Sequence, residues 1–396
     1  MDPALSLIIS ILLILLLIRL RISISISILC GATLLGILTI GQEVFYHMIN
    51  TSASLETLRL VALVLAAFTL GYSMEYFQLL EDLTAAASRM AGKMSIPILP
   101  SVVGFLPMPG GALLSAVMLK KPVNLYNIPG DVATYINYWF RHFWIPIWPL
   151  YPSFIIAAAV VEAEYTQFIL STYPITLGAI VGGILFTRIG KLGNPTVNKQ
   201  DLKIVIKSIY PILLVAFLTL LFKIDLLYTI LLSLAILYIQ NRASPGDIGK
   251  ILRKTIDYKI IILIFAVMIY KDLIVATGAA EVFFGHLQTY NFPPFAAAFL
   301  LSFIVGFATG IELSYASVAM PMLTMFTGTA AGLVPQNLML VFGAGFLGVM
   351  MSPLHLCLVL TADYFNAGLN SVYRYLAPVF ATCFLFIVVF FILYNL

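Results

Sequence analysis

The sequence predicts an all-α polytopic membrane protein made of two inverted repeats of five spans each, with two re-entrant hairpins and two broken transmembrane helices. Composition, long apolar runs and a set of repeated short motifs predict this fold. Of the 396 residues, 62% are hydrophobic and only 10% are charged, and the mean hydropathy is +1.05. A soluble domain of this length has a far more polar composition.

Apolar runs recur along the whole chain. A helix rises about 1.5 Å per residue and the hydrocarbon core of a bilayer is about 30 Å thick, so runs of this length predict helical spans rather than barrel strands. The predicted unbroken spans are residues 4–22, 24–41, 55–79, 166–187, 207–223, 225–241, 258–275 and 373–394. The first run is followed, not preceded, by basic residues, which favours a retained span with an outside N-terminus over a cleavable signal peptide.

Two further regions are interrupted. Residues 125–163 contain Pro146, Pro149 and Pro152, and residues 335–363 contain glycines at 343, 345 and 348 followed by Pro353. Proline and glycine at these places predict spans that break near mid-membrane. Each is preceded by an apolar stretch with turn residues at its centre, in 94–121 and 293–325, which predicts two re-entrant hairpins.

Short motifs recur at a fixed offset. Residues 103–105 and 305–307 both read Val-Gly-Phe, Ser115 falls near Ser317, and Pro-Leu at 149–150 recurs at 353–354. The offset of about 202 to 204 residues divides the chain into a first repeat at 1–190, a cytoplasmic linker at 191–206 and a second repeat at 207–396. Because five spans is an odd number, the second repeat is expected to be inverted.

The basic residues sort with this topology. Seventeen of the 21 Lys and Arg residues fall in predicted inner loops, and the predicted outer segments 42–54, 161–166, 276–292 and 326–334 contain none. Both termini are therefore predicted to lie outside. This distribution in loops also argues against a nucleic-acid partner, which would need one basic face.

The chemistry is expected where hairpin tips and broken helices leave backbone groups without partners. Helix N-termini there suit an anion, and C-terminal ends suit a cation. In the first hairpin tip, Pro107 and Pro109 lack amide donors while Gly110 and Gly111 allow a ligand close to the backbone. A tight turn without a ligand is the alternative.

The second hairpin tip adds Thr309, Gly310 and Glu312. A carboxylate is costly in hydrocarbon, so Glu312 is expected to be paired, protonated or bound to a cation. We interpret Glu312, with Thr309, as the site of a coupling H⁺ or Na⁺, with a structural ion pair as the alternative. Ser115 and Ser314 are candidate donors to substrate, although serine in such helices also bonds to its own backbone.

Arg141 lies within the first broken span, where its planar guanidinium suits a carboxylate. The alternative is an ion pair with Glu312 or Asp363. At the repeat offset Arg141 corresponds to Gly345, so the binding site is predicted to be chemically asymmetric. Tyr151 and His355, which occupy matching positions, are candidates to bind substrate or, equally, to cap a helix.

Other classes of protein lack their signatures. Cys30, Cys357 and Cys383 show no paired spacing and no nearby His cluster, so no metal site or disulfide is predicted. No Gly-Lys-Ser/Thr phosphate loop is present, and the four His residues do not form a His-Glu-x-x-His motif. We expect no enzyme and no cofactor; a membrane-embedded enzyme acting on a lipid head group is a distant alternative.

Residues 104–112, 148–152 and 352–358 resemble an uncharacterised prokaryotic integral-membrane family of the ion-transporter superfamily, and the resemblance covers essentially the whole chain. It implies a homodimeric elevator-type secondary carrier in the cytoplasmic membrane. The hairpin tip departs from the Ser-Asn-Thr motif of the Na⁺-coupled dicarboxylate carriers, which leaves the substrate and the coupling ion open. The sequence thus predicts a symporter of a small organic anion, with cation exchange as the alternative.

Overall fold

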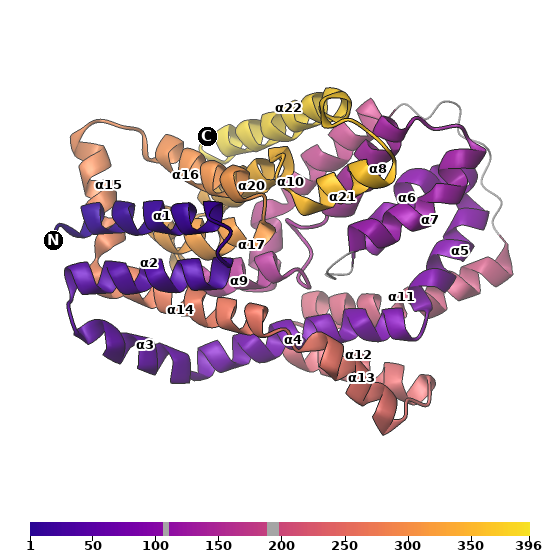
Figure 1. Cartoon of the computed structure of the whole chain (residues 1–396), viewed down its shortest axis with the longest axis horizontal. Coiled ribbons are helices and arrows are strands. Elements are labelled where there is room, and N and C mark those ends of the chain that lie inside the picture. Colours follow the sequence, from indigo (N-terminus) through magenta and orange to yellow (C-terminus); the bar gives the residue numbers. More distant parts are fainter. Residues whose placement is uncertain (106–110, 188–197) are drawn as a thin grey trace.

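The computed structural model describes residues 1–105, 111–187 and 198–396, and throughout these ranges the regular elements are helices (Figure 1). The first part of the chain contains α1 (Pro3–Arg19), α2 (Ile24–Thr39), α3 (Glu43–Ala53), α4 (Leu55–Tyr76), α5 (Leu79–Ala91), α6 (Ser95–Val103), α7 (Gly111–Leu125), α8 (Gly130–His142), α9 (Pro152–Val160) and α10 (Tyr165–Phe186).

The second part contains α11 (Lys199–Leu221), α12 (Leu226–Gln240), α13 (Pro245–Thr255), α14 (Tyr258–Thr277), α15 (Ala279–Thr289), α16 (Pro294–Thr309), α17 (Glu312–Ser314), a π-helical turn (Tyr315–Ala319), α18 (Met320–Met322), α19 (Thr324–Thr327), α20 (Pro335–Met351), α21 (Leu356–Tyr364) and α22 (Leu369–Tyr394). Helix α11 begins within the predicted linker 191–206, because Asn198 caps its first turn and the apolar pattern then continues.

The two parts have the same order of elements. Each contains two apolar helices, a short helix, a long helix, another short helix, a hairpin, a broken helix and a final long helix. The division into two repeats and their inversion stay predictions, but this order is the one the motif offset implies. The all-helical membrane fold itself is confirmed.

Six segments of the described chain are long and apolar enough to cross a bilayer. They are Leu55–Tyr76, Tyr165–Phe186, Lys199–Leu221, Tyr258–Thr277, Pro335–Tyr364 and Leu369–Tyr394. Helices α1, α2 and α12 are also apolar but have 17, 16 and 15 residues, and at about 1.5 Å per residue they are shorter than the hydrocarbon core.

Four short helices, α3, α5, α13 and α15, were not predicted as elements. Each follows or precedes a span and carries more polar residues than its neighbours, so the search for long apolar runs passed over it. A start signal was available for one of them. Ser244 and Asp247 form a reciprocal capping box at the beginning of α13.

Helix breaks fall within both predicted broken spans, 125–163 and 335–363, but one cause was misassigned. Residues 143–151 separate α8 from α9, and residues 352–355 separate α20 from α21. The glycines at 343, 345 and 348 do not interrupt α20. They let it pack closely: a Cβ added at Gly348 would overlap the Phe303 carbonyl of α16. The break starts only at Ser352, beside Pro353.

The Val-Gly-Phe motif packs in the same way in both parts. A Cβ added at Gly104 would overlap the carbonyl oxygen of Arg141, and one at Gly306 would lie 2.5 Å from the carbonyl oxygen of Gly345. Arg141 and Gly345 are themselves partners at the repeat offset. Each motif therefore seats one hairpin arm against the broken helix that follows it.

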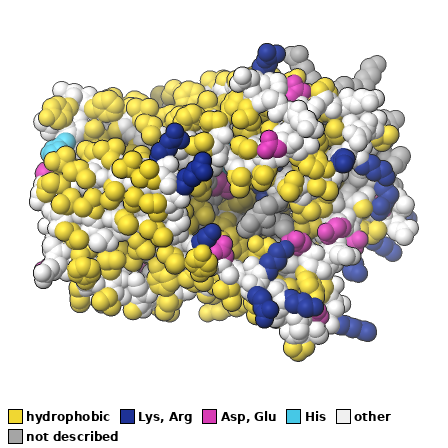
Figure 2. All heavy atoms as spheres, in the orientation of Figure 1, with side chains coloured by type: hydrophobic (Ala, Val, Ile, Leu, Met, Phe, Trp, Pro, Cys, Tyr) yellow, Lys and Arg dark blue, Asp and Glu magenta, His cyan; other side chains and the backbone are white. Residues whose placement is uncertain are grey.

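The outer surface of the helical layers is apolar. Helix α1 exposes Leu5, Leu12 and Leu16 while it packs against α2, and α2 in turn packs against α14. Figure 2 shows hydrophobic side chains covering this part of the molecule, whereas Lys and Arg gather towards the opposite end and over α13. A surface of this kind suits contact with lipid.

Candidate functional site

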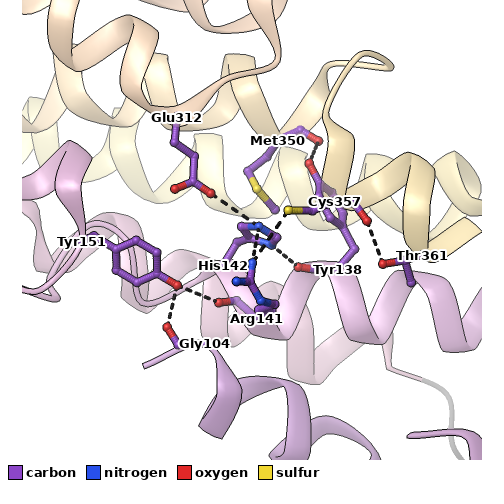
Figure 3. Close-up of polar contacts among 9 residues, drawn as sticks. All are labelled: Gly104, Tyr138, Arg141, His142, Tyr151, Glu312, Met350, Cys357 and Thr361. Carbon is purple, nitrogen blue, oxygen red and sulfur yellow. Dashed lines mark hydrogen bonds and ion pairs between the residues drawn. The ribbon is translucent and has the colours of Figure 1, made fainter. Parts of the chain in front are cut away.

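The second hairpin, the end of α8 and the start of α21 converge on one buried cluster (Figure 3). Helix α8 ends with Arg141 and His142, which are 4% and 0% exposed. His355 and Cys357 come from the break before α21 and from its first turn, and Glu312 comes from α17. Two of the sequence candidates, Arg141 and Glu312, thus lie in the same site although 171 positions separate them in the chain.

The guanidinium of Arg141 lies among donors and acceptors from separate elements. Its Nη1 is 3.3 Å from His142 Nε2 and 3.8 Å from Cys357 Sγ. A Cβ at Gly111 would overlap this guanidinium, so glycine at the start of α7 makes room for it. Asp363, one predicted partner, is exposed at the end of α21 and does not fill that role.

His142 connects Arg141 with Glu312. Its Nδ1 is 2.6 Å from the carbonyl oxygen of Tyr138, and its Nε2 is 3.4 Å from Glu312 Oε1. A carbonyl oxygen only accepts, so Nδ1 carries the proton and Nε2 of the neutral ring offers a lone pair. Two acceptors, Nε2 and the carboxylate, then face each other, and Arg141 Nη1, 3.3 Å from Nε2, is the donor beside them.

His142 was not selected as a site residue from the sequence. The signal was its position next to Arg141 at the end of a broken span, and the fold was needed to show what it faces. Asn137, one turn earlier, was also missed. Its Nδ2 donates to the Ala112 carbonyl at 3.0 Å and to Thr361 Oγ1 at 3.1 Å, which joins α8 to the first hairpin and to α21.

His355 lies beside His142, as the ring centroids are 5.0 Å apart and nearly perpendicular. Its Nδ1 is buried without a hydrogen-bond partner in the described part of the chain. The Tyr138 ring packs against both imidazoles, and its hydroxyl donates to the Met350 carbonyl at 3.0 Å, next to the second break. The structure thus brings the sequence candidate His355 into the cluster.

The prediction that no cysteine lies near a histidine cluster is wrong for Cys357. One potential ligand atom from each of His142, His355 and Cys357 lies within 4.8 Å of the others. The two histidines are 213 positions apart in the chain, so spacing could not reveal the cluster. Cys30 is exposed and Cys383 is buried elsewhere.

Tyr151 lies at the edge of the cluster and is already engaged. Its hydroxyl donates to the Gly104 carbonyl at 2.5 Å, and it lies 3.4 Å from the carbonyl oxygen of Arg141. Trp144 and Trp148 donate to the carbonyls of Ser101 and Phe105 at 3.1 and 2.8 Å. Donors from the first break thus satisfy carbonyls in the last turn of α6 and just beyond it, so the Tyr151 hydroxyl caps this helix end.

The second hairpin turns through Gly310, which has φ = +63° and follows the last residue of α16. A side chain there would be strained and would also press on the His355 amide. The Thr309 and Ser314 hydroxyls are 2.5 Å apart, and they accept from the Ile311 amide and donate to its carbonyl, respectively. Both hydroxyls therefore shape the turn that presents Glu312.

The remaining candidates belong to the first hairpin. Ser115 is buried and donates to the Ala112 carbonyl at 3.1 Å, so its hydroxyl bonds to its own helix. Pro107, Pro109 and Gly110 lie outside the described residues. Gly111 begins α7 and contacts the Arg141 side chain.

The described residues form a multi-pass, all-helical membrane protein. A solved structure of the YdaH transporter from Alcanivorax borkumensis matches with a TM-score of 0.60, at 13% sequence identity, over 99% of this chain and 98% of that one. Residues 2–394 match the family model described as "Protein of unknown function (DUF401)", and the chain belongs to that family. No curated protein matches.

Proposed function

We propose that this protein is a secondary active transporter of a small organic anion, coupled to H⁺ or Na⁺. We assign a carboxylate as the anionic group of the substrate. The observation that carries this proposal is a guanidinium, Arg141, held 4% exposed where both broken helices meet the second hairpin. Placing an Arg near the centre of a membrane helix costs about 3 kcal/mol or more in insertion free energy. An Arg at such a position therefore marks a functional site by default.

The surroundings of Arg141 favour an anionic ligand. The guanidinium carries a fixed charge and a planar set of donors that matches a carboxylate. Gly111 lets the backbone approach the guanidinium closely, and Gly310 does the same for the backbone beside His355. These small residues therefore allow each hairpin to pack closely against a broken helix.

The coupling ion is assigned to Glu312. Its Oε1 faces His142 Nε2 at 3.4 Å, and the Tyr138 carbonyl keeps the other ring nitrogen protonated. Two opposed acceptors bind a proton or a cation between them. Thr309, through Ser314 and the Ile311 amide, keeps the turn in shape.

Alternating access is proposed to follow an elevator mechanism in a homodimer. The matching hairpins and broken helices, and the likeness to a solved transporter fold, support this assignment. We place the protein in the cytoplasmic membrane of a prokaryote, with both termini outside, because the Lys and Arg residues collect in the loops predicted to be inside. The proposal includes no catalytic step and no cofactor.

Uptake into proteoliposomes tests the proposal. Labelled small carboxylates are offered with a pH gradient, a Na⁺ gradient or neither, and we expect saturable uptake that one of the gradients drives. Glu312→Gln should abolish gradient-driven accumulation while substrate exchange between equal pools persists. Uptake that ignores both gradients would contradict coupling.

Cation exchange is the second candidate, favoured by the Glu312–His142 pair alone. It predicts Na⁺- or H⁺-dependent ion flux without any anion, lost in Glu312→Gln and kept in Arg141→Gln. The same two variants therefore separate the candidates, because anion transport requires both side chains.

A further inference from the structure

Four side chains that are suitable as metal ligands meet at the end of α8. His142, His355 and Cys357 contribute ligand atoms within 4.8 Å of one another, and Glu312 Oε1 lies 3.4 Å from His142 Nε2. His142 and His355 are almost fully buried, and Cys357 is partly buried. Two imidazoles, a thiol and a carboxylate form the mixed nitrogen, sulfur and oxygen set that Zn²⁺ prefers.

The ligand orientation is fixed by a second layer of contacts. The Tyr138 carbonyl accepts from His142 Nδ1 at 2.6 Å, which leaves Nε2 as the coordinating atom. Metal-binding histidines usually donate their other ring nitrogen to a carbonyl or carboxylate in this way. His355 adds an independent sign, because its buried Nδ1 has no partner among the described residues.

The distances suit a tetrahedral ion. With metal–nitrogen and metal–oxygen bonds of about 2.1 Å, the edge of a tetrahedron is about 3.4 Å. The observed separation of His142 Nε2 and Glu312 Oε1 is 3.4 Å. His355 and Cys357 each have a potential ligand atom within 4.8 Å of one of His142, so an ion bound by His142 and Glu312 would draw these two side chains closer.

Arg141 stands in competition with such an ion. Its Nη1 is 3.3 Å from His142 Nε2 and 3.8 Å from Cys357 Sγ, so the guanidinium contacts two of the ligand atoms that an ion would need. Its charge also opposes a second cation nearby. The long side chain must therefore swing away before the ion binds.

We propose that His142, His355, Cys357 and Glu312 form a Zn²⁺ site that is occupied when the Arg141 guanidinium withdraws from it. On binding, the Cys357 thiol releases its proton to solvent and ligates as the thiolate, while both histidines bind as neutral rings. The ion would connect α8, α17 and α21. The site shares residues with the proposed transport site, but its test reads metal binding and does not depend on transport.

The experiment uses the purified full chain without a polyhistidine tag, treated with chelator and dialysed against Zn²⁺. We expect about one Zn²⁺ per chain. Loading with Co²⁺ should give a thiolate-to-metal charge-transfer band, which reports a sulfur ligand directly. Cys357→Ser should remove that band, and His142→Gln should reduce Zn²⁺ affinity at least tenfold.

Matched controls come from the same chain. Cys30→Ser and His286→Gln alter an exposed cysteine and an exposed histidine and should leave binding unchanged. Arg141→Gln should bind Zn²⁺ about tenfold tighter, because the competing charge is gone; a general loss of structure cannot produce this gain. Wild-type protein that binds no Zn²⁺, or a Co²⁺ band that survives in Cys357→Ser, would overturn the proposal.

Discussion

Each of the two units of hairpin and broken helix packs a glycine against a large side chain, but the glycine and the large residue lie on opposite elements in the two units. In the first unit, a glycine on the hairpin, Gly111, makes room for the large Arg141 on the broken helix. In the second, a glycine on the broken helix, Gly345, makes room for the large Tyr315 on the hairpin. The space beside the glycine thus holds a charged guanidinium in the first unit and an aromatic ring in the second.

Under the proposed function, this difference separates substrate binding in the first unit from structural packing in the second. Tyr315 is fully buried and packs against Phe342 with ring centroids 5.1 Å apart, so the second unit is filled by apolar contact. The first break is longer, and Trp144, Trp148 and Tyr151 use it to hold the end of α6. The first unit is therefore the one that presents a cation, and the second contributes Glu312 from its hairpin turn.

Removal of the Arg141 charge should have the largest effect. Arg141→Gln is expected to lower the initial rate of carboxylate uptake at least 100-fold, because the fixed cation at the site is lost. Arg374→Gln, which changes an exposed arginine on α22, is the control and should transport normally. Uptake by Arg141→Gln within threefold of wild type would show that the asymmetry between the units does not concern substrate.

The second unit should respond to volume rather than to charge. Gly345→Ala places a methyl group against the Tyr315 ring, and such overpacking typically costs about 1–3 kcal/mol. Thermal unfolding in detergent should show the loss. In the double variant Gly345→Ala, Tyr315→Leu, the leucine is smaller than the tyrosine ring and should recover part of the lost stability. Strictly additive losses would mean that the two residues do not share one space.

The equivalent substitution in the first unit should act on affinity. Gly111→Ala pushes against the end of a flexible arginine side chain, so thermal stability should change little while the KM for uptake rises about tenfold. This result contrasts with Gly345→Ala, where stability falls. A large loss of stability in Gly111→Ala would instead assign both glycines to packing alone.

The smallest effect concerns the capped end of α6. Trp148→Phe keeps most of the ring packing against Phe105 but removes the 2.8 Å bond to its carbonyl, which is worth about 1 kcal/mol. A decrease of a few degrees in the unfolding midpoint is expected, with uptake retained. Tyr228→Phe, which changes an exposed tyrosine on α12, is the control for loss of an aromatic hydroxyl and should leave the midpoint unchanged.

Prediction from sequence succeeded where a signal is local. Apolar runs identified the long spans, and Pro353 and the cluster of prolines at 146–152 located both breaks. It failed for α3, α5, α13 and α15, whose polar faces weaken the apolar signal. It also misread the glycines of α20, because the sequence alone does not distinguish a glycine that permits close helix packing from one that interrupts a helix.

The sequence by itself determined the membrane environment, the places of the long spans and of both breaks, and the pair of residues, Arg141 and Glu312, at which the two parts differ. These follow from hydropathy, breakers and a motif offset, all of which act along the chain. Only the tertiary structure decided that His142 stands between that pair and that Cys357 joins His142 and His355. The contacts of His142 with Glu312, His355 and Cys357 join residues 170 to 215 positions apart, so tertiary packing sets them and sequence spacing does not reveal them.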